Sequence, residues 1–79
     1  MVLAKTEEEW GLRASAFLKA EMKKADVTYA ELVKRLKKHG LKETEAGITM
    51  KLKRGTFTAI FFLACIAALE LEGVALEEI

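Results

Sequence analysis

The sequence contains no proline, and only five glycines interrupt its 79 residues. Proline breaks helices and sheets, and glycine weakens helices, so a chain with so little of either is expected to be helical along most of its length. Hydrophobic residues make up 52% of the chain and charged residues 32%, a balance typical of a packed protein rather than a disordered one. The sequence therefore predicts a single all-α domain over residues 1–79.

Threonines stand where helices are expected to begin. Thr6 and Thr28 are each followed three positions later by a glutamate, which is the pattern of a capping box. Thr44 and the segment Thr56-Phe57-Thr58 offer caps for two further helices. Glycine suits the left-handed residue that ends a helix, and we expect this role for Gly40 and Gly55.

The caps and the apolar periodicity together predict four short helices. They span approximately residues 7–24, 29–38, 45–54 and 59–71. Residues 1–6 form an N-terminal extension, and residues 72–79 form a short acidic tail. The pattern of the tail fits either a last helical turn or a strand.

The expected helix over residues 59–71 is apolar on every side. Such a helix has to be buried all round, and three other short helices cannot easily cover it. We therefore expect help from the tail or from a second copy of the chain. This predicts a homodimer whose interface is made of Phe62, Cys65, Ile66 and Leu69.

Reactive side chains are scarce, because the sequence has one residue each of Ser, Asp, Cys and His. Nucleophilic catalysis needs a nucleophile, a base and an orienting group close together, and a structural zinc site normally needs four ligands. Ser15, Asp26, His39 and Cys65 are spread over the chain and form no such pattern. We expect neither an enzyme nor a protein with a metal, another cofactor or a small-molecule substrate.

The longest uninterrupted apolar run covers residues 59–69, and a membrane-spanning helix needs about 20 apolar residues. The first residues turn acidic at once, unlike a signal peptide. A single cysteine cannot form an intrachain disulfide, so no oxidising compartment is indicated. We expect a cytoplasmic protein without a membrane partner.

Charge is sorted along the chain. Residues 1–18 carry a net charge of −1, residues 19–54 carry +6 and residues 55–79 carry −4, which together make the formal net charge of +1. Contacts with phosphates supply most of the non-specific affinity of nucleic-acid-binding proteins, so the basic middle of the chain favours such a partner. A solvated helical surface would explain the same lysines.

The residues of the two middle helices resemble a known motif. Residues 27–36 resemble the first helix of a lambda-repressor-like helix-turn-helix domain, and Ile48, Leu52 and the Arg54-Gly55 pair resemble its second, recognition helix. More narrowly, Trp10 and residues 20–23, 29–32, 51–55 and 57–63 are similar to a bacterial domain family of unknown function built on that fold.

The resemblance implies that the chain binds double-stranded DNA as a transcriptional regulator. The helix that begins near Thr44 would lie in the major groove, and the preceding helix would brace across the DNA backbone. The expected contacts to bases or nearby phosphates are Thr44, Thr49, Met50, Lys53 and Arg54, and the expected contacts to phosphates are Lys34, Lys37 and Lys38.

The sequence contains neither asparagine nor glutamine. These amides are the usual bidentate partners of adenine, so low sequence specificity is expected. The missing amides fit a thermophilic source and equally fit chance in a short chain. The alternative function is a protein-protein interaction module on the same fold, for which Ala46, Gly47 and Met50 offer a small apolar patch.

Glu21 is the one charged residue on the inward stripe of the first helix, which also contains Trp10, Ala14, Phe17 and Leu18. Either the last turn of this helix has left the core, or Glu21 is a partly buried carboxylate that needs a cation. We expect a tertiary pair of Glu21 with Lys51 or Arg54 that fixes the recognition helix against the first helix.

Overall fold

The computed structural model describes residues 2–79, and Met1, the first residue of the predicted extension, lies outside the described residues. Four α-helices and one turn of 3₁₀-helix make up the regular structure of residues 2–79, and this part of the chain contains no strand. The elements are α1 (Glu7–Ala25), α2 (Tyr29–Lys38), α3 (Glu45–Arg54), α4 (Ala59–Ala68) and η1 (Leu76–Glu78). The all-α prediction is confirmed, and the tail forms a 3₁₀ turn.

Each α-helix follows a threonine whose hydroxyl oxygen accepts a hydrogen bond from the backbone amide three residues later. This bond satisfies one of the amides that the first turn of a helix leaves without a partner. The N···Oγ1 distances lie between 2.9 and 3.1 Å for Thr6–Glu9, Thr28–Glu31, Thr44–Gly47 and Thr58–Phe61. The predicted caps are confirmed, and Thr58 is the cap of α4.

The last α-helix is shorter than predicted, because it ends at Ala68 instead of residue 71. Glu70 adopts the left-handed conformation with φ of 60°. The backbone amide of Leu71 then donates to the carbonyl of Ile66 at 3.0 Å, which closes the helix. Glycine usually occupies such a position, so a glutamate there left no sign in the sequence.

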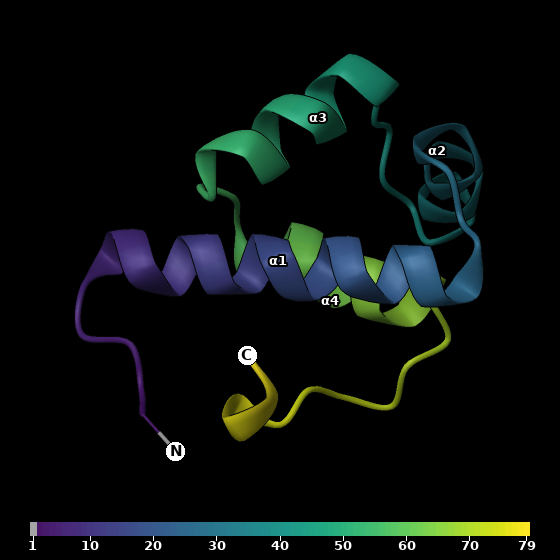
Figure 1. The fold of residues 1–79 in the computed structure, drawn as a ribbon. Coiled ribbons are helices and arrows are strands. Elements are labelled where there is room, and N and C mark those ends of the chain that lie inside the picture. The colour runs from purple at the N-terminus through teal and green to yellow at the C-terminus, as the bar shows by residue number, and fades with distance from the viewer. Residues whose placement is uncertain (1) are drawn as a thin grey trace.

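The helices pack around α1 (Figure 1). α3 and α4 lie on different sides of α1, and α2 packs against both α3 and α4 near the C-terminal end of α1. From the end of α4 the tail runs back toward the beginning of α1. α3 is therefore supported by α1 and α2, and its remaining surface faces outward.

The core takes residues from all four α-helices. Side chains less than 2% exposed come from α1 (Leu18), α2 (Leu32, Leu36), α3 (Ile48, Leu52) and α4 (Phe61, Cys65). Leu32 and Leu36 stand four positions apart, as do Ile48 and Leu52, so the sequence predicts each pair on the inner face of its helix, and their burial confirms this. Trp10 is different: it was expected on the inward stripe of α1, yet it is 37% exposed and lines open depressions at the surface beside Phe57.

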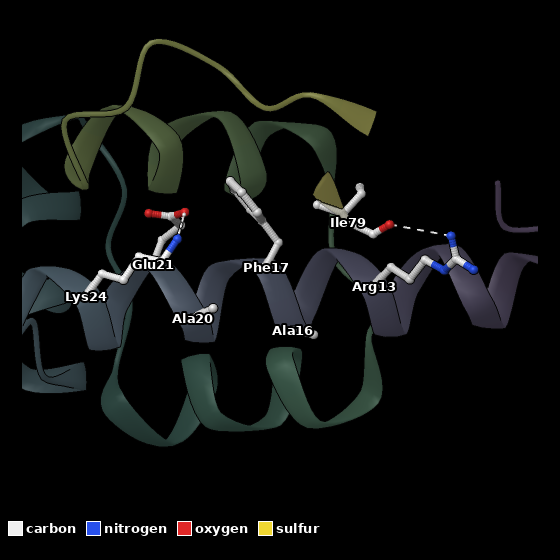
Figure 2. A pocket seen from close by; sticks show the side chains of 7 residues that line it. All are labelled: Arg13, Ala16, Phe17, Ala20, Glu21, Lys24 and Ile79. Atoms are coloured by element: carbon white, nitrogen blue, oxygen red, sulfur yellow. Dashed lines mark hydrogen bonds and ion pairs between the residues drawn. The ribbon is translucent and has the colours of Figure 1, made fainter. Parts of the chain in front are cut away.

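Arg13 connects both ends of the described chain to α1. Its Nη1 donates to the carbonyl oxygen of Val2 at 2.7 Å and to that of Ile79 at 3.4 Å. The segment before α1 and the tail therefore meet at the same part of α1 (Figure 2).

Candidate nucleic-acid interface

The outward side of α3 forms the centre of the candidate interface. Ile48 and Leu52 hold the other side of this helix in the core, where they are 0% and 1% exposed. Side chains three and four positions apart share one face of a helix, so the outward side follows from these two anchors. Its exposed residues are Ala46, Thr49, Met50, Lys53 and Arg54. Four of the five predicted base-contact or nearby phosphate-contact residues thus share this side of α3.

The fifth predicted residue, Thr44, lies at the N-terminal end of α3 and differs from Thr49 in its hydrogen bonds. The Thr44 hydroxyl oxygen accepts from the amide of Gly47, so its proton is free to be donated. The Thr49 hydroxyl donates to the carbonyl of Glu45 at 2.8 Å, within the helix. Thr44 can therefore donate to a phosphate oxygen, whereas Thr49 offers mainly its methyl group to a partner.

The three lysines predicted to contact phosphates are all exposed on α2: Lys34, Lys37 and Lys38. Arg35 on the same helix is occupied. Its Nε donates to Glu31 at 3.1 Å, and its Nη1 donates to the carbonyl of Ala68 at the end of α4 at 3.0 Å. The lysines are therefore available to an external anion, while Arg35 fastens α2 to α4.

Ion pairs leave most of the basic middle of the chain unneutralised. Within residues 19–54 they join Lys24 to Glu21, Arg35 to Glu31 and Lys51 to Glu43. The carboxylates left in this segment are Asp26 and Glu45. The cations left are all exposed: Lys19, Lys23, Lys34, Lys37, Lys38, Lys42, Lys53 and Arg54. Glu45 is exposed in the first turn of α3.

The ion pair predicted between Glu21 and Lys51 or Arg54 is wrong. Glu21 pairs with Lys24 of its own helix at 3.3 Å. Both side chains line an open groove of about 530 Å³ beside the tail, on the side of α1 away from α3 (Figure 2). A carboxylate on that side cannot reach α3.

Lys51 pairs instead with Glu43 in the connection between α2 and α3. The Glu43 side chain is only 12% exposed, and Lys51 Nζ lies 4.8 Å from the centroid of the Phe61 ring in α4. This pair takes over the role predicted for Glu21, since it fixes α3 to its neighbours. Sequence reasoning missed it because a carboxylate eight positions away and outside the helix has no recognisable spacing.

Both cations that line the groove beside the tail already form contacts within the chain. Arg13 donates to the carbonyls of Val2 and Ile79, and Lys24 is neutralised by Glu21. The rest of its lining consists of Ala16, Phe17, Ala20 and Ile79. Among residues 2–79, no group of three or more histidine, cysteine, aspartate and glutamate side chains gathers as metal ligands would.

A known family covers most of the chain. The domain of unknown function DUF6471 matches residues 10–74, which include α2, α3, α4 and nearly all of α1. The chain belongs to the DUF6471 family. No curated protein and no solved structure matches the chain. The candidate interface thus lies inside the DUF6471 domain.

The dimer interface predicted for this DUF6471 domain is wrong in its position. Cys65, Ile66 and Leu69 are 1%, 8% and 6% exposed and belong to the core of a single chain. Phe62 is half-buried and packs against Phe17 and Phe57, with ring centroids 6.4 and 6.2 Å apart. A helix that is apolar all round gives no periodicity to show which side faces inward, and the prediction took the inward side.

Burial also sets the state of the single cysteine of the DUF6471 domain. The pKa of the Cys65 thiol is raised from 9.0 to about 12. Removal from water is the largest cause, the charge of Glu43 acts in the same direction, and the charge of Lys51 opposes both. The thiol is therefore neutral at physiological pH. A buried neutral thiol is a poor nucleophile, so Cys65 acts as a small apolar core residue.

A helix with the length and hydropathy of a membrane span is not found in residues 2–79.

Proposed function

We propose that this chain is a small DNA-binding protein of helix-turn-helix type that regulates transcription with low sequence specificity. The observation that carries the proposal is the position of α3, whose inner side is anchored by Ile48 and Leu52 while its outward side remains exposed beside unpaired cations. In helix-turn-helix proteins the second helix of the motif lies in the major groove and the first crosses the backbone. α3 and α2 take these two roles in the proposal.

The side chains at the middle of the outward side of α3 are small or unbranched, which allows the helix to approach DNA closely. Ala46 and Met50 stand at its middle, with Gly47 beside them, so no bulky branched or aromatic side chain separates the helix from the floor of a groove. The major groove, about 12 Å wide, accommodates an α-helix. Lys53 and Arg54 at the C-terminal end reach guanine edges or phosphates, and the Thr44 hydroxyl donates to a phosphate at the other end.

The charges supply the affinity. Lys34, Lys37, Lys38, Lys53 and Arg54 are exposed and form no ion pair within residues 2–79. Each phosphate that a cation neutralises adds about 0.9 to the magnitude of the slope of log affinity against log salt. Five such contacts correspond to a slope of about −4.5. The exposed Glu45 opposes binding near the beginning of α3.

The chemistry of the outward side supports low specificity. Amides, which read adenine, are missing from the sequence, and the Thr49 hydroxyl proton is used inside the helix. Direct readout is left to Lys53 or Arg54 on guanine and to Met50 and the Thr49 methyl against thymine methyl groups.

The test is the binding of a labelled duplex by fluorescence anisotropy over a series of salt concentrations. The wild-type chain is expected to bind with a steep salt dependence, and Lys53→Glu is expected to abolish binding. Lys5→Glu is the matched control, because it makes the same change of charge on an exposed residue outside the interface. The proposal is wrong if no duplex binds at low salt, and the assignment of α3 is wrong if both variants have equal effects.

The alternative is a protein-protein interaction module that uses the same side of α3 without contacting DNA. The observation that favours it is Met50, an apolar side chain 42% exposed, next to the small residue Ala46. Small and flexible apolar residues suit a partner helix. Absence of duplex binding in the anisotropy assay, together with an unchanged fold, favours this alternative.

A further inference from the structure

One side of α4 is apolar and exposed. It consists of Ala59, Ile60, Leu63 and Ala67, here called the α4 stripe, all of which are exposed. Ile60 and Leu63 are 70% and 65% exposed, more than any other large hydrophobic side chain in the helices of residues 2–79. α4 has no charged residue in either its first or its last turn. Contiguous exposed apolar side chains of this kind mark a surface that a partner covers.

The tail leaves Ile60, Leu63 and Ala67 of the α4 stripe uncovered, because it packs on another side of the helix. Val74, Leu76 and Ile79 line an apolar depression together with Phe62 of α4 and Trp10 of α1. Leu71, Val74 and Ile79 pack against the core next to it. Within one copy, the tail and α1 thus cover the side of α4 that contains Phe62, and Ala59 lies at the edge of this depression. Ile60, Leu63 and Ala67 of the α4 stripe remain exposed.

We propose that a second copy of this chain covers the α4 stripe, with the two α4 helices antiparallel about a two-fold axis near Leu63. A two-fold axis brings the same surface of both copies together, so the surface has to be self-complementary. In the antiparallel arrangement Ile60 lies opposite the partner's Ala67, and Leu63 lies next to the partner's Leu63. A large side chain then meets a small one at each end, which fills the space between the helices.

A parallel arrangement fits the same residues poorly. It would place Ile60 against the partner's Ile60 and Ala67 against the partner's Ala67, so the helices would be held apart at one end and leave a gap at the other. The alternation of size along the α4 stripe therefore selects the antiparallel arrangement.

The charges on either side of α4 select the same orientation. Lys53 and Arg54 precede the helix, and Glu70 and Glu72 follow it, all of them exposed. Antiparallel helices bring the acidic end of one copy toward the basic end of the other, while parallel helices bring like charges together. The first turn of α4 also lacks an acidic residue of its own to complement the helix dipole, and the partner's Glu70 can supply one.

The contact is small, so the dimer is weak. Ten residues of α-helix are about 15 Å long, and a single pair of such helices buries less than the roughly 800 Å² per partner of a standard stable interface. A dissociation constant on the order of micromolar is expected for such a contact. The proposal does not depend on DNA binding, since Ile60 and Leu63 are not part of the α3 surface.

Disulfide cross-linking tests both the surface and the orientation. The wild-type chain is expected to form no cross-link under mild oxidation, because Cys65 is 1% exposed and its thiol stays neutral. In the Leu63→Cys variant, the new thiols of the two chains are expected to form a disulfide with each other at the two-fold axis. The double variant Ile60→Cys/Ala67→Cys is expected to cross-link between chains, since seven helical residues separate its thiols by about 10.5 Å, too far for a disulfide within one helix. Ile60→Cys alone is expected to remain monomeric on a non-reducing gel.

Other outcomes overturn the proposal. If Ile60→Cys alone cross-links as readily as the double variant, the two α4 helices are parallel. If Leu63→Cys cross-links no more than Leu12→Cys does, the α4 stripe is not the interface. Leu12 is the matched control, because it is an apolar residue of α1 that is 50% exposed.

Sedimentation gives a second measurement that needs no added cysteine. At tens of micromolar the wild-type chain and Leu12→Glu are expected to sediment as a monomer-dimer mixture, and Leu63→Glu as a monomer with unchanged helical circular dichroism. Monomeric wild type at all concentrations contradicts the proposal. Lys37→Glu removes a proposed phosphate contact on α2, outside the α4 stripe and the charges that flank α4. It is expected to weaken duplex binding and to leave both cross-linking and sedimentation unchanged, so the two proposals fail separately.

Discussion

The backbones of Gly11 and Gly55 are in direct contact, so that a Cβ atom added to Gly11 would lie 2.0 Å from the carbonyl oxygen of Gly55. Gly11 belongs to α1, and Gly55 ends α3 in the left-handed conformation with φ of 69°. The contact holds the C-terminal end of α3, where Lys53 and Arg54 are exposed, directly on α1. Gly55 is needed because it adopts the left-handed conformation, and Gly11 is needed because it has no side chain.

Gly11→Ala is therefore expected to destabilise the chain. Helix propensity alone would favour alanine by about 0.5–1 kcal/mol, but a clash with backbone atoms forces α3 to move, and such overpacking typically costs about 1–3 kcal/mol. Urea denaturation measures the net loss. Gly73→Ala is the control, because nothing lies within 4 Å of a Cβ atom added there, and a loss as large for Gly73→Ala would contradict this explanation.

A double-mutant cycle tests the pair of Glu43 and Lys51. The single variants Glu43→Gln and Lys51→Gln are expected to show a coupling of about 0.5–1 kcal/mol, which is modest because the lysine is partly exposed. The same cycle on Glu21 and Lys51 is expected to be additive, because Glu21 pairs with Lys24. Equal coupling in both cycles would contradict the observed arrangement of α3.

Because the Cys65 thiol is buried, the folded chain is expected to become less stable at high pH. Because the pKa of Cys65 rises from 9.0 to about 12 on folding, the unfolded chain loses this proton first as the pH increases. The contribution of the neutral Cys65 thiol to the free energy of unfolding is complete below pH 9.0. It is lost between pH 9.0 and about 12, at about 1.4 kcal/mol per pH unit.

The measurement compares wild type with Cys65→Ala by urea denaturation at pH 8 and at several values above 9. Lysine titration affects both proteins alike, so it cancels in the difference. The stability advantage of wild type is expected to shrink as the pH rises, and an advantage that does not change with pH would show that the thiol ionises equally in both states.

Arg35→Gln is expected to loosen the contact between α2 and α4. It removes the hydrogen bond to the Ala68 carbonyl and the ion pair with Glu31, at a cost of about 1–2 kcal/mol. Arg35→Lys is expected to recover only part of this loss, because one ammonium group lacks the planar fork that reaches both acceptors. Lys34→Gln, on an exposed neighbour, is expected to stay within about 0.5 kcal/mol of wild type in the same urea titration.

The helices could be predicted closely from the sequence. Thr28 and Thr44 each cap the helix that they precede, and α2 and α3 have the bounds that were expected. The end of α4 could not be predicted, because Glu70 adopts a conformation that glycine normally takes and nothing in the local sequence requires it. The exposed residues of α3 also followed from its periodicity, since Ile48 and Leu52 identify the inner side.

Predictions that depended on how two helices face each other were less successful. Glu21 and Lys51 each have a different partner from the expected one, and the side of α4 chosen for an interface lies in the core.

The sequence by itself determined where the helices begin and which side of α2 and α3 is buried, because caps and amphipathic periodicity act between residues only a few positions apart. Only the tertiary structure decided which side of the uniformly apolar α4 is exposed, which charges pair, and that Gly11 has to meet Gly55. These depend on the relative placement of helices that are distant in sequence, and no local pattern encodes that placement.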